Sequence, residues 1–328
     1  MFSKLTPLAE TNIPPLLCAN AAGRLLHSDS RQIKQGDIFV ACQGEYTDGR
    51  SYIPAAIANG AAFVFWDDDG KFAWNPEWKV PNQGIKDLKH RAGMLAAQVY
   101  GNVSDDLKVW GVTGTNGKTS ITQWLAQAAD LLGEKTAIIG TVGNGFWGAL
   151  EETTHTTPAP VDVQTLLYRF RQQGATAAAM EVSSHGLDQS RVNGVPFRSA
   201  IFTNLTRDHL DYHGTMEAYG AIKSRLFYWH GLKHAVINVD DEYGAELAGR
   251  LKKDCPDLTV YSYGFSEHAD IRIVHFTASS DGMEAVFQTP WGEGRCRTRL
   301  LGRFNAQNLA ACIALLCANG YPLDKVLD

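Results

Sequence analysis

The chain has 328 residues, of which 45% are hydrophobic and 20% charged, and its formal net charge is −5. This length and composition are typical of a globular protein with two domains, each able to bury a core. The sequence has no basic block and no apolar run long enough to cross a bilayer, which argues against a nucleic-acid partner and against a membrane protein.

Residues 1–98 form the first predicted domain. Its expected elements are a turn and short buried strand at 36–41, a helix at 53–60, a strand at 62–66 and a helix at 88–98. We place the domain boundary at Gly101-Asn102, which follows the last of these helices.

The second predicted domain, residues 99–328, begins with a strand, a Gly-rich turn and a helix. Residues 109–113 are apolar, and apolar side chains then recur at helical spacing from Ile121 until Gly133 ends the helix. A strand at 136–140 completes a βαβ unit, which implies a parallel sheet.

The rest of this domain continues the alternation and then changes character. Helices are expected at 161–173, 216–228 and 241–253, strands at 175–182, 199–203 and 235–239, and shorter strands at 271–276, 284–288 and 295–300. The fold class is therefore α/β, with a mostly parallel central sheet, a small antiparallel extension and a last helix that begins near Asn305. The chain stops at residues 326–328, directly after an apparent helix start, so we expect a third domain to be absent from it.

The cysteines and the first residues bear on the compartment. Six cysteines are scattered without a CxxC pair, at Cys18, Cys42, Cys255, Cys296, Cys312 and Cys317. This pattern favours buried, reduced thiols in a cytoplasmic protein without a structural metal. Residues 1–10 lack the features of a secretory signal. We expect a cytoplasmic monomer.

Residues 111–119, Gly-Val-Thr-Gly-Thr-Asn-Gly-Lys-Thr, indicate a phosphate-binding loop. Glycines let the backbone turn tightly onto phosphate oxygens, and the N-terminus of the following helix adds partial positive charge. Lys118 would reach the β- and γ-phosphates, and the Thr119 hydroxyl would bind Mg²⁺. Val112 replaces the first glycine of the standard motif. The alternative, a Gly-rich turn without a ligand, is disfavoured because Gly-Lys-Thr falls at a strand-to-helix junction.

Further polar residues follow two later strands. Glu181 ends one strand, and residues 203–211 follow the next, bringing His209 and two carboxylates to the same edge of the sheet. Mg²⁺ prefers oxygen ligands, so His209 taken by itself has a structural interpretation. Lys223, taken by itself, is an ordinary solvated lysine within a helix.

Together these segments resemble the Mur ligases, and most closely the branch of that family that forms the UDP-N-acetylmuramoyl tripeptide. The resemblance covers nearly the whole chain, as two of the three domains of such enzymes. Residues 181–187 (Glu-Val-Ser-Ser-His-Gly-Leu) and 207–214 (Arg-Asp-His-Leu-Asp-Tyr-His-Gly) are its most specific parts. The other matching stretches are Asp29-Ser30-Arg31, the loop at 111–119, Thr141-Val142-Gly143, Thr156-Thr157, Lys223 and residues 302–308.

The resemblance implies residues for two binding sites. Those for ATP are Gly114, Thr115, Asn116, Gly117, Lys118, Thr119, Ser120, Asn204, Asn305 and Asn308. Those for the UDP-linked substrate are Ser28, Ser30, Glu45, Tyr46, Thr47, His155, Thr156, Thr157, Ser183, Gln189 and Arg191. At His155 the sequence departs from the asparagine of a relative, although imidazole can also donate a hydrogen bond.

The resemblance also implies metal ligands and a modification. The ligands would be Thr119, Glu181, His209 and Lys223, the last as a carbamate (N6-carboxylysine), which is an anionic oxygen ligand suited to Mg²⁺. Lys118, Lys223 and His209 would be the catalytic residues. The cofactors implied are ATP and Mg²⁺.

The reaction implied is ATP-dependent ligation of an amino acid in the synthesis of peptidoglycan precursors. ATP would phosphorylate the terminal D-glutamate carboxylate of UDP-N-acetylmuramoyl-L-alanyl-D-glutamate, and the amine of the incoming amino acid would attack the acyl phosphate. We expect meso-diaminopimelate rather than L-lysine, on general likeness. The family places the amino-acid pocket in the third domain, so the fragment is expected to be inactive alone.

Two rivals remain open at this point. A folylpolyglutamate synthase would share the phosphate loop but handle a pterin, and residues 29–31 and 36–37 favour the UDP-binding module instead. A non-catalytic nucleotide-dependent interaction protein is the other, and the intact set of Lys118, Thr119, Glu181 and Lys223 speaks against it.

Overall fold

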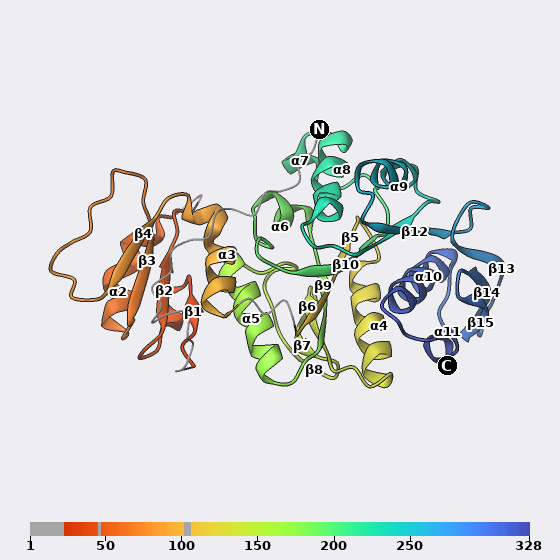
Figure 1. The fold of residues 1–328 in the computed structure, drawn as a ribbon, viewed down its shortest axis with the longest axis horizontal. Helices are drawn as coiled ribbons and strands as arrows, with labels where there is room; N and C mark the ends of the chain where they lie inside the picture. Colours follow the sequence, from red (N-terminus) through yellow and green to blue (C-terminus); the bar gives the residue numbers. More distant parts are fainter. Residues whose placement is uncertain (1–22, 45–46, 102–105) are drawn as a thin grey trace.

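The computed structural model describes residues 23–44, 47–101 and 106–328, which form two α/β units (Figure 1). Glu45 and Tyr46, two of the expected substrate-binding residues, lie outside the described residues, as do Cys18 and Asn102 of the expected boundary. Within the described ranges, no helix is both long and apolar enough to cross a bilayer.

The N-terminal unit is a parallel sheet of four strands with helices on both faces. Its strands are β1 (Leu26–His27), β2 (Ile38–Ala41), β3 (Phe63–Asp67) and β4 (Asn82–Ile85), and its helices are α2 (Ile53–Ala58), α3 (Leu88–Val99) and the 3₁₀ turns η1 (Ser30–Gln32) and η2 (Gly49–Tyr52). Strand β2 is buried along its length, as expected of a short apolar strand covered on both sides. The face under α3 and the face under α2 carry separate apolar clusters.

The second unit is built on a sheet of eleven described strands, in the order β15-β14-β13-β12-β11-β10-β5-β9-β6-β7-β8. The pairs from β13 through β6 are parallel, and antiparallel strands extend both ends. The strands are β5 (Lys108–Thr113), β6 (Thr136–Gly140), β7 (Gly143–Phe146), β8 (Ala149–Glu151), β9 (Ala177–Glu181), β10 (Phe197–Phe202), β11 (His234–Asn238), β12 (Thr259–Gly264), β13 (Ile271–Ser279), β14 (Gly282–Thr289) and β15 (Gly292–Thr298).

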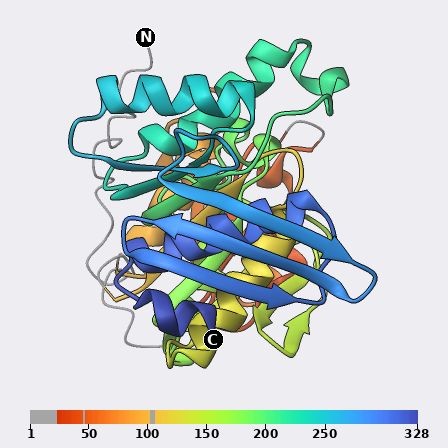
Figure 2. The ribbon, with the colours of Figure 1, turned by 90° about the vertical axis from the view of Figure 1, so that its right-hand side faces the viewer.

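Helices cover both faces of this sheet. They are α4 (Lys118–Leu131), α5 (Pro160–Gln172), α6 (Ser184–Asp188), α7 (Leu210–His213), α8 (Met216–Ser224), the 3₁₀ turn η4 (Arg225–Tyr228), α9 (Glu242–Asp254), α10 (Arg303–Ala318) and α11 (Leu323–Leu327). One apolar cluster joins α4 and α10 to the sheet, and another joins α5, α9 and η4 to the opposite face. Figure 2 shows β13, β14 and β15 as a layer beside α10 and α11.

The expected fold class is confirmed, with differences at particular elements. The helix expected at 216–228 is two pieces, α8 and η4, and its start is fixed by Thr215, whose hydroxyl accepts from the N–H of Ala218. Strands β1, β4, β7, β8 and β12 were not expected from the sequence. Strand β7 contains two glycines at positive φ, and β8 has only three residues, so both lack the usual strand pattern.

Candidate active site

Two glycines in the left-handed region of backbone space build the turn between β5 and α4. Gly114 has a φ of 139° and Gly117 a φ of 89°, values that other residues rarely adopt. A Cβ on Gly114 would lie 1.9 Å from the hydroxyl oxygen of Thr203, and one on Gly117 would lie 2.8 Å from Oδ1 of Asn308. The loop backbone therefore packs directly against β10 and α10, and both positions require glycine.

Two lysines point at the same carbonyl of this loop. Nζ of Lys118 donates to the carbonyl oxygens of Gly114 at 3.0 Å and Thr115 at 2.8 Å, and Nζ of Lys223 donates to that of Gly114 at 2.9 Å. Burial lowers the pKa of both amines, and the charge of Lys118 helps to lower the pKa of Lys223 to about 7. A bound anion would stabilise both cations, since each now shares its acceptor with a like charge.

The carboxylate of Glu181 ties three segments together at the carboxyl edge of the sheet. Its side chain is buried and accepts from the Thr119 hydroxyl at 2.9 Å, the Thr141 N–H at 2.8 Å and the Thr141 hydroxyl at 3.2 Å. A Cβ on Gly140 would lie 2.3 Å from this carboxylate, so the preceding strand also packs against it. All of these donors are uncharged, which leaves the buried negative charge without a cation in direct contact.

Asn204 braces the phosphate loop from the end of β10. Its side chain accepts from the N–H of Asn116 at 3.0 Å and donates to the carbonyl of Asn116 at 3.2 Å, while its own carbonyl accepts from the N–H of Thr115. Two loop N–H groups that the sequence assigned to phosphate are thus bonded to Asn204. The first turn of α4, which has no side-chain cap, is the part of the loop best placed for an anion.

The other residues expected at the nucleotide lie around the same loop. Asn308, in the first half of α10, is buried against Gly117 and bonds to Asn305 at 3.5 Å between Nδ2 and Oδ1. Ser120 lies in the first turn of α4. The structure therefore brings together the whole set expected for ATP.

His209 lies in a neighbouring cluster of aromatic and imidazole rings. Its backbone has a φ of 51°, its Nε2 lies 3.4 Å from the carboxylate of Asp208, and its ring centre lies 5.0 Å from that of His185. His213 hydrogen-bonds through Nε2 to the Ser184 hydroxyl at 2.9 Å. Burial lowers the pKa of His185 and of His213. The side chain of His209 is about half exposed, which leaves it free to approach a ligand.

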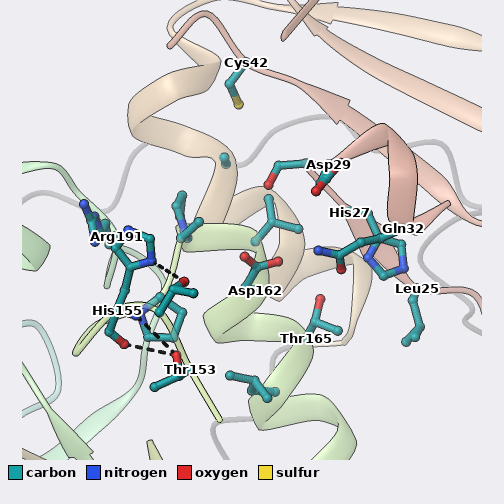
Figure 3. Close-up of a pocket in the computed structure, with 18 of the residues that line it drawn as sticks. Leu25, His27, Asp29, Gln32, Cys42, Thr153, His155, Asp162, Thr165 and Arg191 are labelled. Carbon is teal, nitrogen blue, oxygen red and sulfur yellow. Dashed lines mark hydrogen bonds between the residues drawn. The ribbon is translucent and has the colours of Figure 1, made fainter. Parts of the chain in front are cut away.

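A large cavity of about 880 Å³ opens between the two units (Figure 3). Of the residues expected at the UDP-linked substrate, four line it: Ser28, His155, Gln189 and Arg191. Figure 3 shows Asp162 between His155 on one side and Gln32 on the other. Burial raises the pKa of this carboxyl. Four basic side chains on the cavity wall (Arg31, Lys89, Arg169 and Arg191) offer contacts to an anionic ligand, and three carboxylates (Asp29, Glu152 and Asp162) lie on the same wall.

The other expected substrate residues have structural partners in this conformation. The hydroxyl of buried Thr157 donates to the carbonyl of Glu181 at 3.0 Å and accepts from the N–H of Ser183. Ser183 in turn caps α6 through the N–H of Gly186. The Thr156 hydroxyl accepts from Thr141. Ser30 is buried and Thr47 accepts from the N–H of Gly44, and neither is among the residues that line the cavity.

A magnesium site can be tested against these contacts. In the described part of the chain, no group of three or more His, Cys, Asp and Glu side chains is arranged to hold a metal ion. The Thr119 hydroxyl and the Glu181 carboxylate do adjoin, at 2.9 Å, and both are oxygen ligands of the kind that Mg²⁺ prefers. The donor chemistry at Glu181 thus fits this cation when it enters with nucleotide.

Thr141 and Tyr219 are the residues that sequence reasoning did not assign to the site. Thr141 belongs to a stretch that carried the family resemblance, but only its bonds to Glu181 indicate a role. Tyr219 is buried, its ring lies 4.4 Å from Nζ of Lys223, and its hydroxyl lies 3.4 Å from that of Thr115. Its position four residues before Lys223 on one helix face was the available signal.

Comparison with known proteins agrees with this geometry. Residues 112–316 match the model of the Mur ligase middle domain, and residues 24–100 match that of the Mur ligase family catalytic domain. The chain belongs to the Mur ligase family, which confirms the resemblance seen in its motifs.

Individual relatives indicate which branch of the family this chain is most similar to. The UDP-N-acetylmuramoyl-L-alanyl-D-glutamate--2,6-diaminopimelate ligase of Neisseria meningitidis serogroup B is 94% identical over 328 residues, which is 100% of this chain and 67% of the relative. The enzyme of the same name from Chromobacterium violaceum is 55% identical over 98% of this chain and 65% of its own length. A solved structure of a ligase with that name has a TM-score of 0.80 and 33% identity, and covers 93% of this chain and 61% of its own. The chain thus spans about two thirds of the length of these relatives.

Proposed function

We propose that this chain is the nucleotide- and UDP-substrate-binding part of an ATP-dependent ligase. The complete enzyme joins meso-diaminopimelate to UDP-N-acetylmuramoyl-L-alanyl-D-glutamate in the cytoplasm. The observation that carries the proposal is the Gly-rich turn between β5 and α4, where the amine of Lys118 donates to the carbonyls of Gly114 and Thr115 and Thr119 adjoins the carboxylate of Glu181. This arrangement gains most from a polyanion such as the triphosphate of ATP.

The proposed reaction is the one that the resemblance to the Mur ligases implies. A carboxylate oxygen of the substrate's D-glutamate attacks the γ-phosphorus of ATP, the bond to the β-γ bridging oxygen breaks, and ADP leaves. Lys118 holds the γ-phosphoryl oxygens and balances the charge that spreads over them. The amine of diaminopimelate then attacks the acyl carbon, loses a proton and displaces phosphate. The products are therefore the amide, ADP and phosphate.

Mg²⁺ would be held by Thr119, Glu181, His209 and the carbamate of Lys223. When bound it neutralises charge on the phosphates. Glu181 is already fixed by Thr141, which keeps its carboxylate in one orientation at the edge of the sheet. The side chain of His209 now lies beside Asp208 and His185 and would have to leave them to ligate the cation.

The cavity between the units is proposed to hold the UDP-linked substrate. Its wall includes Ser28 on the N-terminal side and Gln189 and Arg191 on the other, and its volume of about 880 Å³ is large enough for a nucleotide sugar. The other residues proposed for this substrate are Thr156, Thr157, Ser183, Ser30 and Thr47, and Glu45 and Tyr46 are proposed for it from the sequence alone. A pterin substrate is disfavoured, since residues 24–100 match a Mur ligase model.

The amino acid is proposed to be meso-diaminopimelate rather than L-lysine, because the similar ligases named above carry 2,6-diaminopimelate in their names. Its pocket is proposed to lie in the third of the relatives' length that this chain does not cover. A monomer remains our expectation.

Binding to the cavity gives the test of this function. Titration calorimetry of the chain with UDP-N-acetylmuramoyl-L-alanyl-D-glutamate is expected to show one site, and Arg191→Ala is expected to weaken it by about 10- to 100-fold, the effect of losing a hydrogen bond to a charged group. Arg198→Ala, an exposed arginine on β10, is the matched control and should bind as the parent does. Lack of binding by the parent chain, or equal affinity of the two variants, would refute the assignment.

Lys118→Ala is expected to abolish productive ATP use. The lost charge should raise the barrier to phosphoryl transfer by roughly 2–4 kcal/mol, the scale for a single electrostatic catalytic group. Turnover would be measured in the full-length enzyme and nucleotide affinity in this chain. Lys135→Ala is the control, because Lys135 is exposed beyond the far end of α4. Unchanged turnover and affinity in Lys118→Ala would contradict the assignment.

A further inference from the structure

The two units meet where two backbone segments touch. A Cβ on Gly93, in the middle of α3, would lie 2.2 Å from the carbonyl oxygen of Asn193, and a Cβ on Gly194 would lie 2.9 Å from the carbonyl oxygen of Gly93. Gly194 also has a φ of 83°. A glycine inside a helix is less favourable than alanine, so the close approach is the physical reason for glycine at position 93. We call Gly93, Asn193 and Gly194 the Gly93 seam.

Hydrogen bonds hold the seam closed. Nδ2 of Asn193 donates to the carbonyl of His90 at 2.9 Å, and its carbonyl accepts from Nε2 of Gln164 at 3.4 Å. The first bond ties α3 of the N-terminal unit to residue 193 of the second unit, and the second bond fixes residue 193 to α5 within the second unit.

A buried tyrosine joins the units at a second place. The hydroxyl of Tyr100 accepts from the N–H of Leu26 at 2.8 Å and lies 2.8 Å from the hydroxyl of Thr165 on α5. Its ring stacks on Tyr168 at 4.5 Å, and Val161 of α5 belongs to the same apolar cluster as α3. Relative motion of two domains is the ordinary expectation, but this interface has a shared apolar core and hydrogen bonds that cross it.

The seam lies close in the sequence to residues of the cavity wall. Gln189 and Arg191 line the cavity, and residues 193 and 194 lie directly after them in the chain. The backbone of this segment is constrained, because the N–H of Arg191 donates to the carbonyl of Gly186 at 2.8 Å and the N–H of Asn193 donates to that of Ser190 at 3.2 Å. A displacement at the seam would therefore shift Arg191 relative to the wall formed by β1 and η1.

We propose that the Gly93 seam positions Arg191 and Gln189 across the cavity from Ser28, so that the site for the UDP-linked substrate is preformed and does not depend on closure of the N-terminal unit. Gly93 and Asn193 are then positioning residues that the substrate does not touch. The proposal rests on the proposed function, because it takes that cavity as the substrate site. Preformation lowers the ordering cost of binding, so loosening the seam weakens binding.

The test uses this chain and two ligands, UDP-N-acetylmuramoyl-L-alanyl-D-glutamate and ATP. Gly93→Ala is expected to lower affinity for the UDP-linked substrate at least tenfold and to change affinity for ATP less than twofold, since the phosphate loop lies away from the seam. Gly174→Ala is the matched control: Gly174 has a φ of 87° at the end of α5 but open space around it, so the variant carries backbone strain without a clash.

A second variant covers the case in which Gly93→Ala does not fold. Asn193→Ala removes the bond to His90 and keeps the backbone contact, and it should lower affinity for the UDP-linked substrate about threefold with ATP binding unchanged. Small-angle scattering of the parent chain should also give the same radius with and without the UDP-linked substrate. Parent-like affinity in both seam variants, equal loss of both ligands, or compaction on binding would overturn the proposal. A parent chain that binds ATP but not the UDP-linked substrate would instead overturn the proposed function.

Discussion

The 328-residue chain is expected to bind its ligands but to form no ligation product. The pocket for diaminopimelate is proposed to lie in the third of the relatives' length that this chain does not cover, so its amine is not expected to be oriented against the acyl phosphate. Orientation of two reactants can contribute roughly 7–11 kcal/mol of a barrier, so its loss abolishes turnover. An acyl phosphate formed in the open site would also be exposed to water and would hydrolyse.

The measurement is a side-by-side assay of this chain and the full-length enzyme. Both receive ATP, UDP-N-acetylmuramoyl-L-alanyl-D-glutamate and either meso-diaminopimelate or L-lysine, and tripeptide product and phosphate are quantified separately. Phosphate release without product would show that the acyl phosphate forms and is lost. Comparable product from the two proteins would show that the chain already holds the amino-acid site.

Lys223→Ala is expected to leave the full-length enzyme nearly inactive. The amine of Lys223 is buried beside Gly114 and Tyr219, and it must be neutral to attack CO₂, forming the carbamate and releasing one proton. Its pKa of about 7 lies below the ordinary 10.5, so the neutral amine becomes the major form as pH rises through 7. The carbamate should therefore increase between about pH 6 and pH 8.

Two readouts test this chemistry. Carbon-13 NMR of the protein in labelled bicarbonate should show a carbamate signal that grows with pH and is missing in Lys223→Ala. Short carboxylates such as acetate should partly restore activity to the variant, since they supply the lost anionic oxygen. Lys233→Ala, a lysine beyond η4, should behave as the parent does. Normal activity in Lys223→Ala would refute a role for the carbamate.

The sequence predicted the order of elements well because most helices and strands of the second unit carry clear periodicity, and a few helices also have a side-chain cap. Helix α9, for example, begins after Asp241, whose carboxylate accepts from the N–H of Gly244. Strands β7 and β8 were not predicted because they are defined by antiparallel pairing with β6 and with each other, and their amino-acid composition is not typical of strands. The ligase class was also predictable, since the phosphate loop and the segments around Glu181 and His209 are long and specific.

The site could be predicted only as a set of residues. The sequence did not indicate that Lys118 and Lys223 share a carbonyl, because they are more than a hundred residues apart and meet only through the packing of α8 on the loop. Nor did it indicate that Thr157 is buried beneath Glu181. The sequence around a threonine does not show whether its hydroxyl contacts a ligand or the backbone. The contacts that identify Thr141 also depend on tertiary structure.

Glu181 has a consequence for how mutants of this enzyme are interpreted. Its carboxylate, at the end of strand β9, accepts hydrogen bonds from the start of α4 and from the residue after β6, and so holds the three segments together. An inactive Glu181→Ala enzyme would therefore be ambiguous, because the same change removes a cation ligand and releases the helix that carries Lys118. Structural damage and lost chemistry become separable only when the melting temperature is followed together with nucleotide affinity at several magnesium concentrations. The residue most easily assigned to chemistry from its sequence motif is thus also part of the scaffold.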